Sequence, residues 1–288
     1  VARNRVLVTT GENTSLPATN TSDAIIALDL DTGEPAWLFQ AMVGDAWNAH
    51  CRGTDETSGP NCPWHWDEYN IGRDFDFGGA AVIVTAEIDG ESVDLVLAGQ
   101  KSGHLWALRA DDGTLEWAQR IGQGTALGGN HWGIATDGET VILTINDPVR
   151  PGAPTPRPGV FAFNVSDGIP IWEYSAEADC DDGRGERLVR CESLFGFSAT
   201  PLIVGNSVIA GTLDGKLFAF DIETGDVLNE IDTTAPLTSI NGLPVQGGSI
   251  DSHAISAAHG MIVTGSGYAR FGQNTGNALI ALTPTDGE

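Results

Sequence analysis

The sequence predicts an all-β fold, a β-propeller of four-stranded antiparallel blades, with about five blades present. One observation is a phrase that recurs five times, in which an apolar run leads into an acidic turn that ends in Gly. A second is the spacing of 55 to 62 residues between copies, apart from a first interval of 80. Such a period leaves room for about four short strands in each unit. A third is the content of 37 Gly and 14 Pro, which suits many tight turns.

Each copy of the phrase is predicted to form a β-hairpin. The copies share a marker alanine, found at Ala27, Ala107, Ala162, Ala219 and Ala281. A glycine follows each marker by six residues, at Gly33, Gly113, Gly168, Gly225 and Gly287. Three copies carry a tryptophan four residues after that glycine, at Trp37, Trp117 and Trp172. The glycine accepts the positive φ of a tight turn, and the tryptophan is expected to pack between neighbouring units.

We interpret residues 1–288 as a single, partial propeller domain with disulfide loops inserted at about 45–75 and 179–192. The first phrase begins inside a strand, and the last one stops directly after its turn glycine. An open arc of blades would leave unpaired strand edges. The sequence is therefore expected to be a fragment of a larger ring.

The four cysteines form two pairs of equal spacing. Ten residues separate Cys51 from Cys62, and ten separate Cys180 from Cys191. Both intervals are rich in Gly and charged residues, as surface loops are, and the short C-x2-C pairs of zinc sites are absent. We therefore predict two local disulfides, Cys51–Cys62 and Cys180–Cys191. Disulfides imply an oxidising compartment, so a periplasmic or secreted protein is expected.

The formal net charge of −25 argues against a nucleic-acid partner, because phosphate binding requires clustered Lys and Arg. The acidity indicates either a solvated surface or steering of a cationic partner such as a basic electron carrier. No apolar run approaches the roughly 18 residues of a membrane-spanning helix, so no membrane span is expected.

Several stretches resemble one protein family over nearly the whole chain. The Ala-to-Gly-to-Trp phrase resembles the tryptophan docking motif of the quinoprotein dehydrogenases, propellers that bind pyrroloquinoline quinone (PQQ). Within that family, five stretches resemble the polyvinyl alcohol dehydrogenase group. They are "TSDAIIALDLDTGEPAWLFQAMVGDAWN", "DFDFGGAA", "GQKSGHLWAL", "GGNHWGIATDG" and "TGSGYARFGQNTGNALIAL". The resemblance implies a quinoprotein alcohol dehydrogenase-like propeller with PQQ and Ca2+ as cofactors. It further implies hydride transfer from a secondary or polymeric alcohol to PQQ, and a cytochrome c as electron acceptor.

Lys101 is the first residue that the resemblance marks, and it is one of only two lysines in the chain. Reduction of a quinone requires a cation near its oxygens, and the family places Arg or Lys before a strand like "SGHLWAL". Lys101 is therefore expected to contact PQQ and to act in catalysis; the alternative is a solvated turn residue. The other lysine, Lys216, follows its turn glycine and is interpreted as a surface residue.

The catalytic base is expected to be a carboxylate that takes the proton of the alcohol. Relatives carry a W-D or W-D-x-D element, but "GDAWN" has Asn48 where the aspartate would stand. Asp74 or Asp76 in "GRDFDFGG" then becomes the candidate base, and Asp45 is the remaining option. The alternative for Asp74 and Asp76 is a structural role at the entry of a strand.

The resemblance also implies ligands for the cofactor and the metal. Glu12 or Asn13 in "TTGENTSLP" is expected to supply an oxygen to Ca2+. Asn146 is expected to touch PQQ at the end of a strand, unless it only forms an Asn-Asp-Pro turn. His131 and Trp132 are further candidates for cofactor binding, although a lone His is often structural.

Two functions remain open at this level. The first is a periplasmic PQQ- and Ca2+-dependent alcohol dehydrogenase, and the second is a non-catalytic propeller scaffold resembling outer-membrane assembly proteins. A fold alone does not choose between them. The discriminating feature is the set of pocket residues, because a scaffold has no reason to keep Lys101, Asn146 and the acidic "DFDFG" together.

Overall fold

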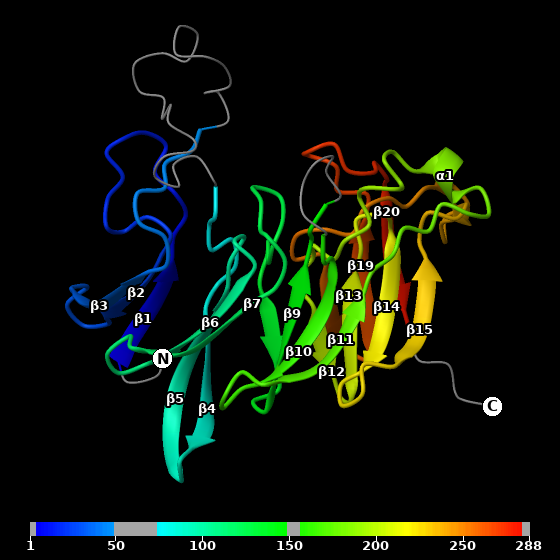
Figure 1. Ribbon diagram of the computed structural model, residues 1–288. Helices are drawn as coiled ribbons and strands as arrows, with labels where there is room; N and C mark the ends of the chain where they lie inside the picture. The colour runs from blue at the N-terminus through cyan, green and yellow to red at the C-terminus, as the bar shows by residue number, and fades with distance from the viewer. Residues whose placement is uncertain (1–3, 49–73, 149–155, 284–288) are drawn as a thin grey trace, which may run out of the picture.

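The computed structural model describes residues 4–48, 74–148 and 156–283, and its strands form successive antiparallel sheets (Figure 1). The first sheet has three strands, β1 (Arg5–Thr9), β2 (Ala24–Asp29) and β3 (Pro35–Gln40). The second has four, β4 (Val82–Ile88), β5 (Glu91–Gly99), β6 (His104–Arg109) and β7 (Leu115–Arg120). The third also has four, β8 (Ile134–Thr136), β9 (Thr140–Ile145), β10 (Gly159–Asn164) and β11 (Pro170–Ser175).

Two further sheets and two small elements complete the described fold. The fourth sheet contains β12 (Leu202–Val204), β13 (Ser207–Gly211), β14 (Lys216–Asp221) and β15 (Val227–Asp232). The fifth contains β18 (Ile255–Ala258), β19 (Met261–Ser266) and β20 (Ala278–Leu282). A hairpin of β16 (Leu237–Thr238) and β17 (Pro244–Val245) and a single helix turn, α1 (Arg184–Arg187), lie outside these sheets. The all-β propeller architecture with about five blades is thus confirmed.

The repeated phrase forms the hairpin between the last two strands of its sheet, such as β6 and β7. The marker alanines pair with the positions four residues after the turn glycine, as Ala27↔Trp37, Ala107↔Trp117, Ala162↔Trp172 and Ala219↔Asn229. The register shifts directly after each of these alanines. The turn glycines have positive φ, for example 75° at Gly33 and 76° at Gly225, as the turn predicts.

Each tryptophan joins its blade to the turn of the next one, as predicted. Trp37 Nε1 donates to Ala110 O at 3.0 Å, and a Cβ on Gly113 would lie 2.5 Å from the Trp37 ring. Glycine is therefore required for the indole to lie flat against the turn. The same contact recurs between Trp117 and Gly168 and between Trp172 and Gly225.

The core consists of apolar layers between neighbouring blades. Leu95 and Leu97 of β5 pack with Leu143 of β9 and Phe161 of β10, so the second and third sheets share one cluster. The seam between the fourth and fifth sheets differs, because Asn229 stands where the other seams have tryptophan. A groove of 790 Å³ lies there, lined by Asn229 and by apolar residues of both sheets.

The predicted disulfide Cys180–Cys191 is present and closes the loop that contains α1. Cys51 and Cys62 lie outside the described residues. Arg184, with a side chain 4% exposed, anchors the loop through ion pairs to Asp214 at 2.8 Å and Asp232 at 2.5 Å.

The interpretation of Lys216 as a surface residue was wrong. Its side chain is only 13% exposed, and its ammonium pairs with Asp179 at 2.5 Å and with Glu230 at 2.6 Å. Within the described ranges, no helix is long and apolar enough to span a membrane.

Candidate active site

The candidate site lies where three chain segments meet beside the first two sheets. Lys101 follows β5 and begins a tight turn, in which Gly103 has a φ of 83° and Gln100 N donates to His104 O at 2.9 Å. Asp74 and Asp76 belong to the extended segment before β4. The backbone N–H of Lys101 donates to Asp76 O at 3.0 Å, which fixes this segment against the turn.

The ammonium of Lys101 lies between the two aspartates. Lys101 Nζ is 2.7 Å from Asp74 Oδ1 and 2.6 Å from Asp76 Oδ2, and the whole residue is only 7% exposed. Such charge-assisted hydrogen bonds hold all three side chains in one arrangement. The structure therefore brings together three of the residues that the sequence marked for catalysis, and Lys101 is not a solvated turn lysine.

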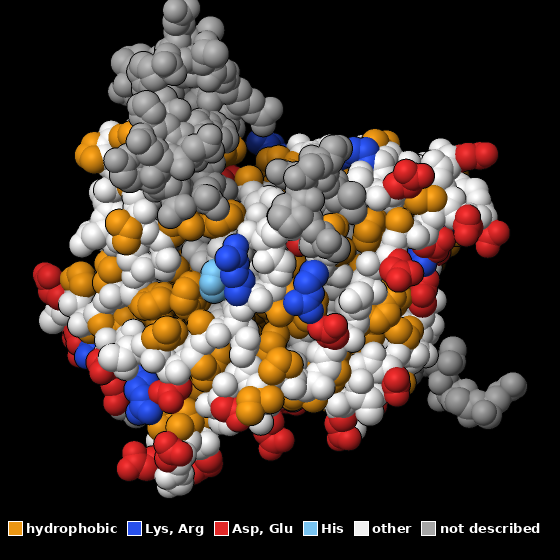
Figure 2. All heavy atoms as spheres, viewed as in Figure 1, with side chains coloured by type: hydrophobic (Ala, Val, Ile, Leu, Met, Phe, Trp, Pro, Cys, Tyr) orange, Lys and Arg blue, Asp and Glu red, His pale blue; other side chains and the backbone are white. Residues whose placement is uncertain are grey.

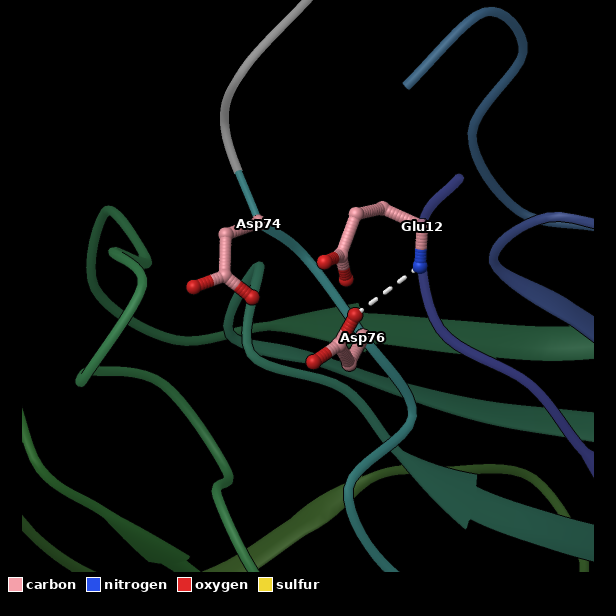
Figure 3. A group of neighbouring side chains, drawn as sticks. All are labelled: Glu12, Asp74 and Asp76. Atoms are coloured by element: carbon pink, nitrogen blue, oxygen red, sulfur yellow. Dashed lines mark hydrogen bonds between the residues drawn. The ribbon is translucent and has the colours of Figure 1, made fainter. Parts of the chain in front are cut away.

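Glu12 completes an acidic cluster with these aspartates (Figure 3). The carboxylates of Glu12, Asp74 and Asp76 point toward one another, with one ligand oxygen from each within 4.8 Å of the others. Glu12 N also donates to Asp76 Oδ1 at 3.0 Å. A Cβ on the preceding Gly11 would lie 2.4 Å from that oxygen, so only glycine lets the segment after β1 pass so close to Asp76.

The cluster carries more acidic groups than one ammonium neutralises, and the pKa values diverge accordingly. Burial, followed by the nearby Asp76 and Asp74, raises the pKa of Glu12 to about 9. Burial also raises the pKa of Asp74 to about 7, although Lys101 opposes the shift. Burial acts in the same direction on Asp76, but hydrogen bonds from Glu12 and Lys101 outweigh it and hold its pKa below the ordinary value.

This donor set fits a hard cation as well as a buried ammonium. Ca2+ prefers carboxylate and carbonyl oxygens, and three carboxylates lie within reach of one point. A cation bound there would displace the protons that burial otherwise retains on Glu12 and Asp74. The arrangement therefore suits both halves of the predicted chemistry, metal binding and proton acceptance.

The other predicted metal ligand and the other predicted base have different surroundings. Asn13 Oδ1 accepts hydrogen bonds from Thr19 N at 2.9 Å and from Thr19 Oγ1 at 3.1 Å, so this amide oxygen closes its own loop. Asp45 is fully buried, and its Oδ2 accepts from Phe75 N at 3.1 Å. Asp45 thus holds the backbone between Asp74 and Asp76 rather than pairing with Lys101.

Asp23 is a buried acid that sequence reasoning missed. It ends the loop before β2 with a φ of 46°, and burial, then Asp45 and Asp76, raise its pKa to about 8. Only the tertiary fold brings it toward Asp45 and Asp76, and the sequence offers no local signal for it.

His131 and Trp132 lie in a polar network that crosses from the third sheet to the fifth. His131 Nδ1 lies 3.2 Å from Ser198 Oγ, and Trp132 Nε1 donates to Asp251 Oδ1 at 2.7 Å. Burial, followed by the charge of Lys101, lowers the pKa of His131 to about 4. The imidazole is therefore neutral at physiological pH and lies within electrostatic reach of Lys101.

Gly129 lies between Asn146 and Lys101 and contacts the backbone of both. Asn146 N donates to Gly129 O at 3.0 Å, and its side-chain Nδ2 donates to Leu127 O. A Cβ on Gly129 would lie 2.1 Å from Lys101 O, so Gly129 packs directly on the turn of Lys101. Asn146 Oδ1 is buried and has no hydrogen-bond partner among the described residues.

Comparison with known proteins identifies the family to which the chain belongs. A family model described as outer membrane protein assembly factor BamB matches residues 1–288, and the chain belongs to that family of PQQ-type β-propellers. The predicted resemblance to polyvinyl alcohol dehydrogenases is confirmed. The chain is 33% identical over 277 residues to a polyvinylalcohol dehydrogenase of Pseudomonas sp, covering 91% of the chain and 39% of that protein.

A second curated relative agrees with this assignment, and a solved structure shares the fold. The chain is 31% identical to a polyvinylalcohol dehydrogenase of Sphingopyxis sp. (strain 113P3), over 99% of the chain and 42% of that protein. It therefore spans about two fifths of the length of these relatives. Among solved structures, the quinohemoprotein alcohol dehydrogenase from Comamonas testosteroni matches with a TM-score of 0.56 at 16% identity, over 99% of this chain and 48% of that one, and shares the fold.

Proposed function

We propose that this chain carries part of the active site of a PQQ- and Ca2+-dependent alcohol dehydrogenase that oxidises secondary or polymeric alcohols. The observation that carries the proposal is the buried ammonium of Lys101 between Asp74 and Asp76, with Glu12 beside them. The names of the two curated relatives support the same class of reaction. Since the chain spans two fifths of those relatives, residues outside it would complete the pocket.

Each residue of the cluster has a role in this proposal. Glu12 and Asp76 would hold Ca2+, and Lys101 would place its charge against the cofactor's quinone oxygens. PQQ, when bound, supplies the acceptor for the hydride of the alcohol. Asp74 would accept the hydroxyl proton, because Lys101 holds its carboxylate beside the oxygens that would bind the metal.

Lys101 also positions the base. Its hydrogen bond of 2.7 Å to Asp74 Oδ1 fixes the orientation of this carboxylate. The two carboxylates outweigh the burial of the ammonium and raise the pKa of Lys101, so its charge persists in a nearly dry environment. A fixed charge of this kind needs no reorganisation during the reaction.

The location and the electron acceptor are part of the proposal. The Cys180–Cys191 disulfide supports an oxidising compartment, hence a periplasmic or secreted protein. Acidic side chains lie along the lower and right-hand edges of the face in Figure 2, in keeping with the net charge of −25. Such a surface supports a basic cytochrome c as electron acceptor through electrostatic steering.

The description of the family model favours one alternative, a non-catalytic scaffold in outer-membrane assembly. A scaffold gains little from this cluster, since removing charges from water costs several kcal/mol for each ion, about as much as pairing returns. Lys101 and Lys216, the two lysines of the chain, allow a test of catalysis against the scaffold, because each pairs with two carboxylates. In the protein expressed from its complete reading frame, Lys101→Met should lower turnover with PQQ and Ca2+ by at least about 100-fold.

Lys216→Met is the matched control, since it also removes two ion pairs but lies in the fourth sheet. It should retain turnover within about threefold and lose less thermal stability than Lys101→Met, because the carboxylates that Lys216 leaves unpaired are more exposed to water. Equal turnover in the two variants would contradict the catalytic role and favour the scaffold.

A further inference from the structure

The loop between β11 and β12 is bonded to two neighbouring sheets. The Cys180–Cys191 disulfide closes part of this loop into a ring, and α1 lies inside the ring, near β14 and β15 of the fourth sheet (Figure 1). The side chains and backbone groups that fix the ring fall into two sets. One set binds the fourth sheet, and the other binds the segment that leads into the fifth.

The first half of the ring is anchored to the fourth sheet. Arg184 pairs with Asp214, in the turn between β13 and β14, at 2.8 Å, and with Asp232, at the end of β15, at 2.5 Å. Directly before the ring, Asp179 pairs with Lys216 of β14 at 2.5 Å. Arg184 and Asp214 are both buried, so this anchor is shielded from water.

The second half of the ring is anchored to the fifth sheet. Val189 N donates to Asn274 Oδ1 at 2.5 Å, and Arg190 Nη2 donates to Gly272 O. Asn274 is only 3% exposed, and its own N–H donates to Ser249 Oγ at 2.9 Å. Gly272 and Asn274 precede β20, and Ser249 precedes β18. The ring therefore holds the approach to two strands of the fifth sheet.

The seam between these two sheets lacks the docking tryptophan of the preceding seams. Trp37, Trp117 and Trp172 join the first four sheets in succession, each through a hydrogen bond to the next sheet. Asn229 has the matching position in β15. An amide lacks the large apolar ring that dominates such a contact. The disulfide ring thus crosses a seam whose usual link is missing.

The disulfide makes the two anchors depend on each other. It joins positions 11 apart in sequence, and Cys191 Sγ lies 3.2 Å from Asp179 O, beside the Lys216 ion pair. A closed ring has fewer conformations than an open chain, so ordering one half also restricts the other. In an open chain, Arg184 keeps its ion pairs while the Val189 half is free to leave Asn274.

We propose that the Cys180–Cys191 ring is a redox-sensitive clamp that joins the fourth and fifth sheets in place of a docking tryptophan. Reduction by a dithiol breaks the S–S bond and yields two cysteine thiols, while the dithiol becomes a cyclic disulfide. The fifth sheet then loosens, and the fourth keeps its ion pairs. The clamp does not depend on the proposed function.

The clamp also reaches toward the candidate site. Gln273, next to Asn274, donates to Asp251 Oδ2 at 2.9 Å, and Asp251 Oδ1 accepts from Trp132 Nε1 at 2.7 Å. Asp251 is only 1% exposed, so these are buried, charge-assisted hydrogen bonds. The position of the Trp132 indole therefore depends on the fifth sheet, and opening the clamp should loosen this side chain as well.

Hydrogen exchange, followed by mass spectrometry in the complete protein, tests the clamp. Dithiothreitol should speed amide exchange in β18–β20 by at least about tenfold, while exchange in β4–β7 changes less than about twofold. Cys180→Ala with Cys191→Ala is the control for any other disulfide. In this double variant, β18–β20 should exchange rapidly with or without dithiothreitol. If it fails to fold, folded wild type that has been reduced and alkylated with iodoacetamide replaces it.

Two substitutions place the effect at the seam. Val189→Pro removes the N–H that binds Asn274 and keeps the disulfide; the preceding Leu188 has the extended backbone that a proline requires before it, with φ −105° and ψ 133°. Its β18–β20 should exchange rapidly in both redox states. Val189→Ala keeps the N–H and should behave as the wild type. Asn229→Trp should weaken the response to dithiothreitol, because an indole joins the seam independently.

Three results would overturn the clamp. Dithiothreitol may leave exchange in β18–β20 unchanged, or speed it equally in β4–β7. It may also speed exchange only in residues 176–195, in which case the disulfide orders its own loop and nothing beyond it.

Discussion

Lys101 Nζ lies 2.7 Å from Asp74 Oδ1 in a nearly dry site, although the two residues are 27 positions apart in the chain. The end of β5 and the extended segment before β4 have to converge to make this contact. The same ammonium also pairs with Asp76, so one cation organises two acids whose pKa values move in opposite directions. The different roles proposed for them, a base and a metal ligand, rest on that asymmetry.

The two aspartates should respond differently to neutralisation. Asp74→Asn removes the base and should lower kcat by about 100- to 10,000-fold even at saturating Ca2+. Asp76→Asn should mainly weaken Ca2+ binding, so that added Ca2+ restores much of the rate. Steady-state rates of the complete enzyme across a Ca2+ series check both expectations. Equal, mild losses from the two variants would place the base elsewhere.

Stability should depend on pH through His104. Burial, followed by the charge of Arg120, lowers the pKa of His104 to about 4, and the imidazole stacks on Trp106 with ring centroids 4.7 Å apart. Because the unfolded chain takes up this proton near pH 6.5 and the folded chain only near 4, the contribution of His104 is present above pH 6.5. It is lost as the pH falls from 6.5 toward 4.

Urea unfolding at pH 7.5 and pH 5 measures this effect. The loss of unfolding free energy between these two values should be smaller in His104→Gln than in the wild type. An identical loss in both proteins would show that His104 does not supply the pH dependence.

The seam at Asn229 should accept a tryptophan. Asn229→Trp would place an indole in the groove of 790 Å³ between the fourth and fifth sheets, as Trp172 does at the preceding seam. Burial of part of that ring should stabilise the protein by about 1–2 kcal/mol. Leu228→Trp, at a position 56% exposed, is the control and should have little effect. Thermal unfolding distinguishes them, and a lower Tm for Asn229→Trp would mean that the groove is filled in another way.

Arg184 should be essential for the fourth sheet and its loop. Arg184→Met leaves Asp214 buried without its partner at 2.8 Å and should cost about 3–5 kcal/mol. The double variant Arg184→Met with Asp214→Asn should recover a large part of that loss, because no buried charge remains unpaired. Urea denaturation of both proteins provides the comparison. A double variant no more stable than the single one would contradict the assignment.

The repeat made the fold predictable, because its markers report backbone geometry directly. Gly33 and Gly113 are needed for positive φ, and Trp37 docks on the turn of the next blade, so spacing alone gave the hairpins and their order. Lys101 stood out because the chain has only two lysines.

Burial and partner choice depend on tertiary contacts that sequence spacing does not encode. Glu12 and Asn13 are neighbours with similar ligand chemistry, and only the bonds from Thr19 to Asn13 Oδ1 separate their roles. Lys216 was misjudged for the same reason, since Asp179 comes to it from another part of the chain. The pKa of Asp23 is raised only because the fold buries this side chain and brings it toward Asp45.

The most direct test of the central claim is a calorimetric titration of PQQ, with and without Ca2+, into the protein expressed from its complete reading frame. Near-stoichiometric binding that requires Ca2+, and that weakens strongly in Lys101→Met but not in Lys216→Met, is the predicted result. Absence of binding in the wild type, or equal binding by the two variants, would contradict the account and return Lys101 to a structural role.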